Sequence, residues 1–471
     1  MKYTTYPEYK DSAVVWVGEL PAHWQKVSLR WVCRRYAGGT PDKTKDLYWD
    51  EGTIPWINSG AVNQTLIAYP SAYITPAGYT GSSAKWIPAG ALVMALAGQG
   101  KTKGMVAQLG ISTTCNQSMA AIVPDHRVNA RFLLWWLFAN YHTIRNLAGG
   151  EQRDGLNLDI LGALPVPVLS DSEQVAIACF LDRKTAEIDT LVDKKRILIE
   201  KLKEKRSALI SRTVTRGLPP EAARAAGLNP HPKLKPSGVE WLGEVPAHWR
   251  TAQLRRFTRM VTSGSRGWAE YYTDEGDIFI RIGNLTRNSI QIDLMDVQYV
   301  SPPQGAEGER TRIKAGDLLF SITAYLGSVA VASASVVGGY INQHIALVRL
   351  DTTRLLPEFA GFAMLADLGQ NQFAGFGYGG TKVQLSLDDV KSLWLPIPPV
   401  SEQRIIADFL DRETAKIDHM VAKVEEAIER LQEYRAALIT AAVTGKIDVR
   451  QEQNRRKNKG DSSPARVGFH A

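Results

Sequence analysis

The sequence predicts a mixed α/β protein with two pseudo-symmetric domains, each followed by a long helix, and it predicts that the two helices pair as a coiled coil. Two observations lead to this prediction. A unit of about 225 residues is written twice in the 471-residue chain, and each copy ends in a heptad pattern of apolar residues. A third observation, the lack of a complete catalytic motif, favours a binding function.

The duplication is visible as segments that return in the same order in both halves of the chain. Its period far exceeds the roughly 20–50 residues of solenoid repeats, so it indicates a duplicated two-part domain. The repeated segments are WVGELPAHW (16–24) and WLGEVPAHW (241–249), Asn116-Gln117 and Asn342-Gln343, and EQVAIACFLDRKTAEIDTLV (173–192) and EQRIIADFLDRETAKIDHMV (402–421).

The front part of each copy is expected to be rich in strands. Short runs of β-branched and aromatic residues lie there between Gly-rich turns. One amphipathic helix is expected to follow the strands in each copy. The expected strands are 54–57, 91–95, 277–282, 317–322 and 328–332, and the expected helices are 130–147 and 357–373.

The back part of each copy is expected to be one long helix. Apolar residues recur there every seven positions, and no Pro or Gly interrupts the pattern. Leu191 and Leu198 are expected to fill the second position of the seam in the first copy. The predicted seam residues are Leu181, Ile188, Leu202, Leu209, Leu410, Ile417, Val424, Leu431 and Leu438.

Charge supports pairing of the two helices with each other. Residues 171–216 carry a net charge of +3 and residues 401–449 a net charge of −3. Opposite charges favour a pair between the copies over a pair of identical helices from two chains. Two solvated faces with balanced charges would be the plainer interpretation.

The repeat and the composition divide the chain into six segments. Five prolines indicate a linker between the copies, and the last segment is polar, basic and expected to be disordered. The segments are a first front domain (1–167), a first long helix (168–216), a Pro-rich linker (217–238), a second front domain (239–398), a second long helix (399–449) and the basic tail (450–471).

Composition limits the class of protein. The net charge of +8 allows a nucleic-acid partner without requiring one. No apolar run approaches the roughly 18 residues of a membrane span, and no secretory signal is recognisable. Cys33, Cys115 and Cys179 are too scattered for a disulfide framework or a zinc knuckle. A cytoplasmic protein is the simplest expectation.

Candidate enzyme motifs are incomplete. Residues 95–102 loosely fit a phosphate-binding loop, but a turn and a strand, rather than a helix, are expected to follow. Residues 373–377 match F-x-G-x-G without the βα context of a methyl-donor site. The eight histidines show no metal-ligand spacing, and His23 and His248 of the repeated PAHW are expected to be structural. We therefore expect no catalytic residue, no metal and no cofactor in this chain.

Polar Gly-rich loops in each copy carry residue types that contact bases and phosphates. Most such loops in proteins are ordinary surface, so each residue alone is a weak candidate. The candidate DNA-binding residues are Thr40, Lys43, Lys45, Asn58, Asn63, Gln99, Lys101, Lys103, Gln152 and Arg153 in the first copy, and Ser265, Arg266, Arg281, Asn284, Arg287, Tyr325, Thr381, Lys382 and Gln384 in the second.

The order of these elements resembles the specificity subunit of Type I restriction–modification systems. A variable domain ends in Leu-Pro-x-Pro, and a helix then opens with Glu-Gln and continues through Phe-Leu-Asp. The matching residues are Leu164 to Pro167, Glu173-Gln174 and Phe180-Leu181-Asp182, then Leu395 to Pro398, Glu402-Gln403 and Phe409-Leu410-Asp411. The resemblance covers nearly the whole chain apart from the tail.

The resemblance implies a fold and a function. Two pseudo-symmetric target recognition domains would be separated by two long antiparallel helices that form a coiled coil. Each domain would bind one half of a bipartite double-stranded DNA site, and the helices would set the spacing. Two methyltransferase subunits and the motor–nuclease subunits would dock on this scaffold. They would bring S-adenosylmethionine, ATP and Mg²⁺, because the specificity subunit itself is not catalytic.

Two other functions remain open. One is a coiled-coil scaffold or orphan subunit that does not bind DNA in a sequence-specific way. The other is a nucleotide-hydrolysing enzyme that uses the loop at 95–102.

Overall fold

The structure is a computed structural model that describes residues 3–98, 100–147, 155–264, 266–302, 305, 310–323, 326–376 and 384–450. Contacts divide the chain into two compact units. Unit 1 comprises residues 1–194 and 426–471, and unit 2 comprises residues 195–425. Each unit therefore contains one front domain together with part of each long helix.

Unit 1 contains a five-stranded sheet in the order β4-β11-β8-β9-β6 and a three-stranded sheet in the order β10-β5-β7. The strands are β1 (Tyr9–Asp11), β2 (Glu19–Pro21), β3 (Gln25–Ser28), β4 (Cys33–Ala37), β5 (Ile54–Ile57), β6 (Leu66–Ile67), β7 (Ala72–Ile74), β8 (Leu92–Ala95), β9 (Val106–Leu109), β10 (Thr114–Cys115), β11 (Met119–Pro124) and β12 (Pro165–Val168). The shorter helices are α1 (Pro76–Thr80), α2 (Ala130–Ala139), α3 (Tyr141–Asn146) and α4 (Leu158–Ala163).

Unit 2 repeats this plan with two four-stranded sheets, β16-β23-β20-β21 and β17-β19-β18-β22. The strands are β13 (Leu234–Pro236), β14 (Glu244–Pro246), β15 (Arg250–Gln253), β16 (Thr258–Ser263), β17 (Tyr272–Thr273), β18 (Asp277–Ile280), β19 (Gln298–Val300), β20 (Leu318–Ser321), β21 (Val329–Val331), β22 (Tyr340–Ile341), β23 (Ile345–Leu350) and β24 (Trp394–Ile397). The shorter helices are α6 (Pro220–Ala225), α8 (Pro357–Leu365), α9 (Asp367–Phe376) and α10 (Leu387–Ser392).

The larger sheet of unit 1 is buried on both faces, which explains the apolar runs of its strands. Successive side chains of a strand point to opposite faces. Leu92 and Met94 of β8 accordingly join the core with helix α2, whereas Val93 and Ala95 join a second core on the other face. In unit 2, Leu318 and Leu319 of β20 divide in the same way.

Two sequence expectations about these elements were wrong. Each helix expected after the strands is two helices, because the first copy breaks between α2 and α3 at Asn140 and the second breaks at Ala366, whose backbone is extended. The segment expected to be a linker (217–238) contains helix α6 and strand β13. Strand β13 pairs with β14 as β1 pairs with β2, so the second copy begins inside the expected linker.

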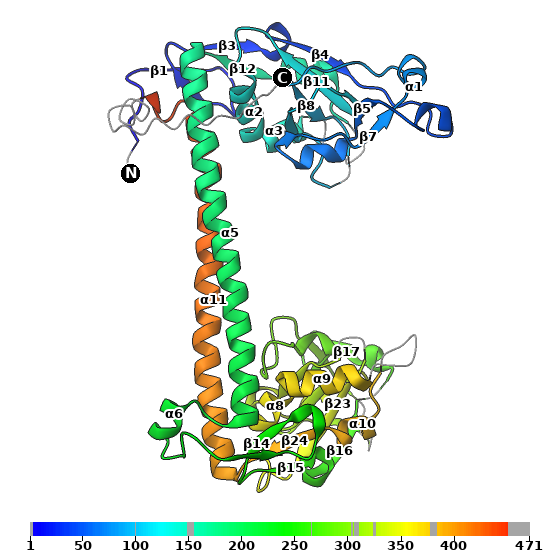
Figure 1. The fold of residues 1–471 in the computed structure, drawn as a ribbon, viewed down its shortest axis with the longest axis vertical. Coiled ribbons are helices and arrows are strands. Elements are labelled where there is room, and N and C mark those ends of the chain that lie inside the picture. Colours follow the sequence, from blue (N-terminus) through cyan, green and yellow to red (C-terminus); the bar gives the residue numbers. More distant parts are fainter. Residues whose placement is uncertain are drawn as a thin grey trace. The chain divides into compact units, whose positions relative to one another are not determined.

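The two long helices, α5 (Asp171–Arg216) and α11 (Val400–Val443), run beside each other (Figure 1). Asp189 accepts hydrogen bonds from Arg435 within unit 1, and Asp418 accepts them from Arg206 within unit 2. Residue numbers rise along one helix as they fall along the other, so the helices are antiparallel. Both pairs join repeat-equivalent residues, because Asp189 corresponds to Asp418 and Arg206 to Arg435. The predicted fold class is thus confirmed.

Burial along the helices defines the seam. Leu181, Ile188, Leu410, Ile417 and Leu438 are buried, and the other predicted seam residues (Leu202, Leu209, Val424 and Leu431) are partly buried. The second seam position was wrongly assigned, because Leu191 and Leu198 are 43% and 44% exposed. Thr185, Val192 and Ile199, one residue further along, are buried instead. The apolar side chains at 191 and 198 therefore remain on the outer face.

The repeated Glu-Gln pair attaches each front domain to its helix. Gln174 accepts a hydrogen bond from the Asn129 backbone N–H (2.7 Å) and donates to the carbonyls of Arg127 and Leu169. Gln403 makes the equivalent bonds, accepting from Leu356 N–H (2.8 Å) and donating to the carbonyls of Arg354 and Pro398. Both glutamines are buried, and each satisfies three backbone groups of its front domain and of the segment before its helix.

The preceding glutamate binds the repeated PAHW motif. In unit 1, Glu173 accepts hydrogen bonds from Tyr6 Oη (2.6 Å), His23 Nε2 (3.1 Å) and Trp24 Nε1 (3.1 Å). Burial and the neighbouring Glu173 raise the pKa of Tyr6 well above its ordinary range, so its phenol stays protonated. In unit 2, Glu402 accepts from His248 Nε2 (2.8 Å). The repeated motifs thus meet in space as structural contacts.

Candidate nucleic-acid interface

Polar loops of unit 1 meet at one end of its larger sheet. The turn after β4 approaches the Asn116-Gln117 turn so closely that a Cβ at Gly38 would overlap the Cys115 carbonyl. The Thr40 hydroxyl donates to Gln117 Oε1 across these turns. The Asn116 N–H donates to the Ile57 carbonyl (3.0 Å), which brings the neighbouring Asn58 to the same place. Three loops distant in sequence thus form one polar surface.

Unit 2 builds the equivalent surface from the repeated residues. A Cβ at Gly264 would overlap the Ile341 carbonyl. The Asn342 N–H donates to the Ile280 carbonyl (3.0 Å), next to Arg281. Thr323, in the turn after β20, forms a β-bridge with Gln384. The predicted residues Arg281 and Gln384 thus flank the Asn-Gln turn, as Asn58 and Thr40 do in unit 1.

His344 organises the surface of unit 2. Its Nδ1 lies 2.8 Å from Thr323 Oγ1, and its Nε2 lies 3.0 Å from Gln343 Nε2. With Gln343 donating to Nε2, the imidazole carries its proton on Nδ1 and donates to Thr323. Within the described part of the chain, one N–H and the carbonyl oxygen of the Gln343 amide then have no other partner, and this is the pair of groups that glutamine uses to recognise adenine.

Gln117, Gln343 and His344 are not among the residues predicted from the sequence. The available signal is the Asn-Gln pair, which recurs in both copies and which was interpreted only as a sign of duplication. Its position at the meeting point of the loops depends on contacts between distant segments, so residue type alone did not reveal it.

Most of the predicted contact residues that the structure describes are accessible. Lys45 lies over the Tyr48 ring (5.2 Å to the centroid), and Arg281 pairs with Asp296 (2.8 Å). The exposed residues are Lys43, Lys45, Asn58, Asn63, Lys101, Arg266, Arg287 and Gln384, and the partly buried ones are Thr40 and Arg281. The candidates Gln99, Gln152, Arg153, Ser265, Tyr325, Thr381 and Lys382 lie outside the described residues.

Two candidates differ from the expectation of exposed contact residues. Asn284 is 4% exposed, and its amide holds the loop by accepting from Arg281 N–H and donating to the carbonyls of Asp293 and Asp296. Lys103 is 7% exposed. Both side chains are occupied by the fold, so they shape the loops instead of presenting a contact group.

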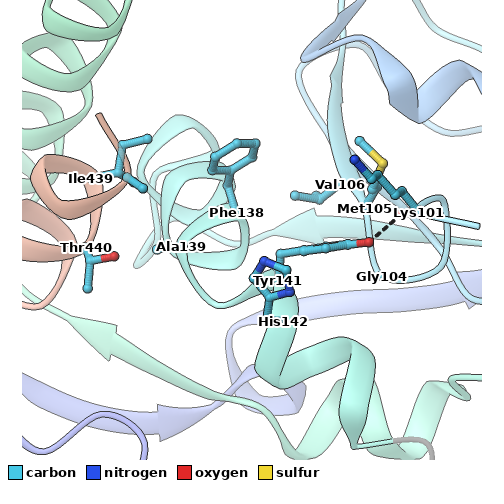
Figure 2. Close-up of a pocket in the computed structure, with 11 residues that line it drawn as sticks. Lys101, Gly104, Met105, Val106, Phe138, Ala139, Tyr141, His142, Ile439 and Thr440 are labelled. Carbon is cyan, nitrogen blue, oxygen red and sulfur yellow. Dashed lines mark hydrogen bonds between the residues drawn. The ribbon is translucent and has the colours of Figure 1, made fainter. Parts of the chain in front are cut away.

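The loop at 95–102 does not have the geometry of a phosphate-binding loop. It joins antiparallel strands β8 and β9, so no helix N-terminus follows β8. Tyr141 Oη donates to the Lys101 carbonyl (2.5 Å; Figure 2). Arg145 donates to the Lys103 carbonyl. The adjoining cavity of about 310 Å³ is lined largely by apolar groups, including Met105, Phe138 and Ile439. Helix α3 thus braces a hairpin loop.

The described part of the chain contains no group of three or more His, Cys, Asp and Glu side chains placed to hold a metal ion. None of its helices has the length and apolar character that a membrane crossing requires.

Comparison with known proteins defines the family. The model of the Type I restriction modification DNA specificity domain matches residues 21–201 and again residues 269–430. The two matches correspond to the two copies of the repeat and together cover most of the chain. The chain therefore belongs to the family of Type I restriction–modification DNA specificity proteins.

Individual relatives share only about a quarter of their residues with this chain over the matched part. The chain is 27% identical over 186 residues to the EcoR124I/EcoR124II specificity subunit of Escherichia coli, covering 39% of this chain and 45% of the relative. It is 27% identical over 217 residues to the EcoKI specificity subunit of Escherichia coli strain K12, covering 44% of each. The matched part thus spans about half the length of these curated relatives.

Solved structures share the fold over nearly the whole chain. A chain from a structure of a type I R-M system aligns with a TM-score of 0.65 at 18% identity, covering 90% of this chain and 98% of that one. The HsdS subunit from Thermoanaerobacter tengcongensis aligns with a TM-score of 0.52 at 18% identity, covering 91% and 98%. At this identity the likeness establishes the fold alone.

Proposed function

We propose that this protein is the DNA sequence-recognition subunit of a Type I restriction–modification complex. The observation that carries the proposal is the pair of equivalent polar surfaces, one in each copy of a domain that matches the DNA specificity family. Their frames are equivalent, but Gln117 of unit 1 bonds Thr40 whereas Gln343 of unit 2 bonds His344. Equivalent frames with different contact groups are what two different half-sites require.

The helices supply the spacing in this proposal. Helix α5 has 46 residues, which at about 1.5 Å per residue corresponds to about 69 Å of helix. Neither long helix is interrupted by Pro or Gly, and each packs by an apolar seam on the other. A paired helix is stiff, so it would hold the two recognition surfaces at a fixed distance along the DNA.

Partners would bring the chemistry. We propose that two methyltransferase subunits dock on this chain with S-adenosylmethionine, and that motor–nuclease subunits add ATP, Mg²⁺ and cleavage. The target adenine of each half-site must leave the base stack to be reached by the methyltransferase. This chain would contribute binding and orientation, and it would act in the cytoplasm.

A base-modification map of host DNA, with and without the gene, tests the proposal. Deleting the gene should remove one bipartite methyladenine motif and leave all other modifications unchanged. Returning the gene on a plasmid should restore the same motif. An unchanged map in a host that expresses the partner subunits would contradict the recognition function and favour a scaffold without sequence-specific binding.

A further inference from the structure

The two copies differ at the buried glutamate that binds PAHW. In unit 1, Oε1 of Glu173 accepts from both Tyr6 Oη and Trp24 Nε1. Tyr6 stands three residues before strand β1, and its equivalent before β13 is His231. Tyr6 is 2% exposed, whereas His231 is exposed to solvent. Among its described residues, unit 2 therefore has no counterpart of the buried Tyr6 phenol.

Unit 2 keeps the buried glutamate and the buried indole N–H that are hydrogen-bonded in unit 1. Glu402 is 7% exposed, and among the described residues its carboxylate bonds to the His248 side chain alone, through Oε2. The indole N–H of Trp249 is fully buried, and within the described part of the chain it donates to no group. The Glu402 carboxylate and the Trp249 indole N–H thus lie where the corresponding groups of unit 1 surround the Tyr6 hydroxyl.

A cavity of about 270 Å³ adjoins Glu402. Its lining includes the polar residues Asn229, His248 and Glu402 and the apolar residues Leu218, Ala223, Leu228 and Pro232. A cavity of about 150 Å³ is enough to bind benzene in another protein, so this one has room for a substituted ring. Arg216 also lines it, which disfavours a cationic ligand.

We propose that unit 2 holds a binding site for a neutral phenol-type group, whose hydroxyl donates to Glu402 and whose ring occupies the adjoining cavity. The arrangement is that of Tyr6 on Glu173, with the ring supplied from outside the chain. The same chemistry could come from a free phenolic compound or from a tyrosine side chain of a partner subunit. A small phenol tests the site without requiring DNA or any partner.

The experiment titrates p-cresol into the purified full-length protein by isothermal calorimetry, with toluene as the ligand of similar shape that lacks the hydroxyl. We expect one equivalent of p-cresol to bind about tenfold or more tightly than toluene, because a hydrogen bond to a charged acceptor adds to ring burial. Equal binding of the two ligands, or no saturable binding of p-cresol, would overturn the proposal.

Two variants fix the location of the site. His231→Tyr gives unit 2 the residue found in unit 1, so its phenol should occupy the cavity and abolish p-cresol binding. Tyr6→Gly should open a matching site at Glu173 and raise the stoichiometry to two. Undiminished binding in His231→Tyr would place the ligand elsewhere and sink the assignment. If Tyr6→Gly binds p-cresol while the wild type does not, phenols are detectable in this assay and unit 2 holds no such site.

Discussion

At the scale of the residue, Gln403 shows how one buried amide joins a recognition domain to a helix. Gln403→Ala leaves the Leu356 N–H without its acceptor, and it leaves the Arg354 carbonyl and the buried Pro398 carbonyl without their donor. We expect unfolding free energy to fall by about 2–3 kcal/mol in urea denaturation. Gln432→Ala, at an exposed position of the same helix, is the control and should change stability little. Equal effects of both substitutions would contradict the structural function of Gln403.

Lys101 and Lys103 stand two residues apart but differ in exposure, and this predicts different effects on DNA binding. Lys101→Ala removes an exposed cation, so the slope of log K against log salt should flatten by about 0.9 if it contacts one phosphate. The assay uses the assembled complex on its mapped site. Lys201→Ala, exposed on α5, is the control. Buried Lys103 should affect folding instead, and an unaltered slope for Lys101→Ala would exclude that phosphate contact.

The buried cysteines predict a loss of stability at alkaline pH. Burial raises the pKa of the Cys33 and Cys115 thiols to about 12 from an ordinary value of 9.0. Between these values the unfolded chain loses protons that the folded chain keeps, so stability is complete below pH 9 and falls above it. Each thiol should cost about 1 kcal/mol between pH 8 and pH 10. The double variant Cys33→Ala/Cys115→Ala should show a smaller fall, and an equal fall would refute this origin.

At the scale of the element, the sequence predicted the long helices well and their outer faces less well. The heptad at Leu181 and Ile188 marks the first seam position because leucine and isoleucine repeat there without a break. The second position is filled by Thr185, Val192 and Ile199, and Arg206 follows in the same series. Because Thr185 and Arg206 are not apolar, this series does not show as an apolar heptad in the sequence. The exposed Leu191 and Leu198 have heptad spacing without being part of the seam. Only the position of the partner helix distinguishes the two stripes.

The pairing register of the helices predicts how to shorten them. Arg206 pairs with Asp418, and the same register within unit 2 places residues 199–205 beside residues 419–425. Deleting both segments removes one heptad from each helix in step, or about 10 Å. At about 3.4 Å per base pair this corresponds to about three base pairs of DNA. Modification mapping should show a shorter spacer between unchanged half-sites.

The control for the heptad deletion is a variant in which the apolar seam residues of the two helices no longer align. Deleting residues 199–205 alone removes the same number of residues from α5 but shifts it against α11. That variant should lose stability and modification together. If the double deletion methylates the original site with its original spacer, the helices do not set the spacing.

At the scale of the whole molecule, the duplication allowed the architecture to be predicted from the sequence. The polar surfaces could not be predicted in the same way, because they are formed by loops whose sequences differ between the two copies. The segments of PAHW and Glu-Gln are similar in both copies because each pair meets in one buried contact. Gln117 and Gln343 also recur, but their neighbours Thr40 and His344 do not correspond. Contacts of that kind depend on turn conformations in segments that differ between the copies, which propensity and periodicity do not determine.

The repeat also predicts the outcome of exchanging the two recognition domains. Each domain leaves its scaffold through a two-stranded pair, with Gln25 opposite Val168 in one copy and Arg250 opposite Ile397 in the other. Residues 25–168 and 250–397 can therefore be exchanged at equivalent positions. The two ion pairs between α5 and α11 join equivalent residues of the repeat, so each end of the helix pair has the same contacts. We therefore expect each end to accept either recognition domain. If a two-fold rotation relates the two copies of the repeat, the protein with exchanged domains presents the same two surfaces to the DNA in the opposite direction.

A bipartite site in duplex DNA is the same site when it is approached in the opposite direction along the other strand. The exchanged protein should therefore methylate the original motif, and the modification map should be unchanged. A variant carrying residues 25–168 at both places is the matched control, and it should methylate a palindromic motif built from one half-site. If the exchanged protein instead methylates a new motif with its half-sites in reversed order, the two domains are related by translation along the DNA, and the two-fold interpretation of the repeat fails.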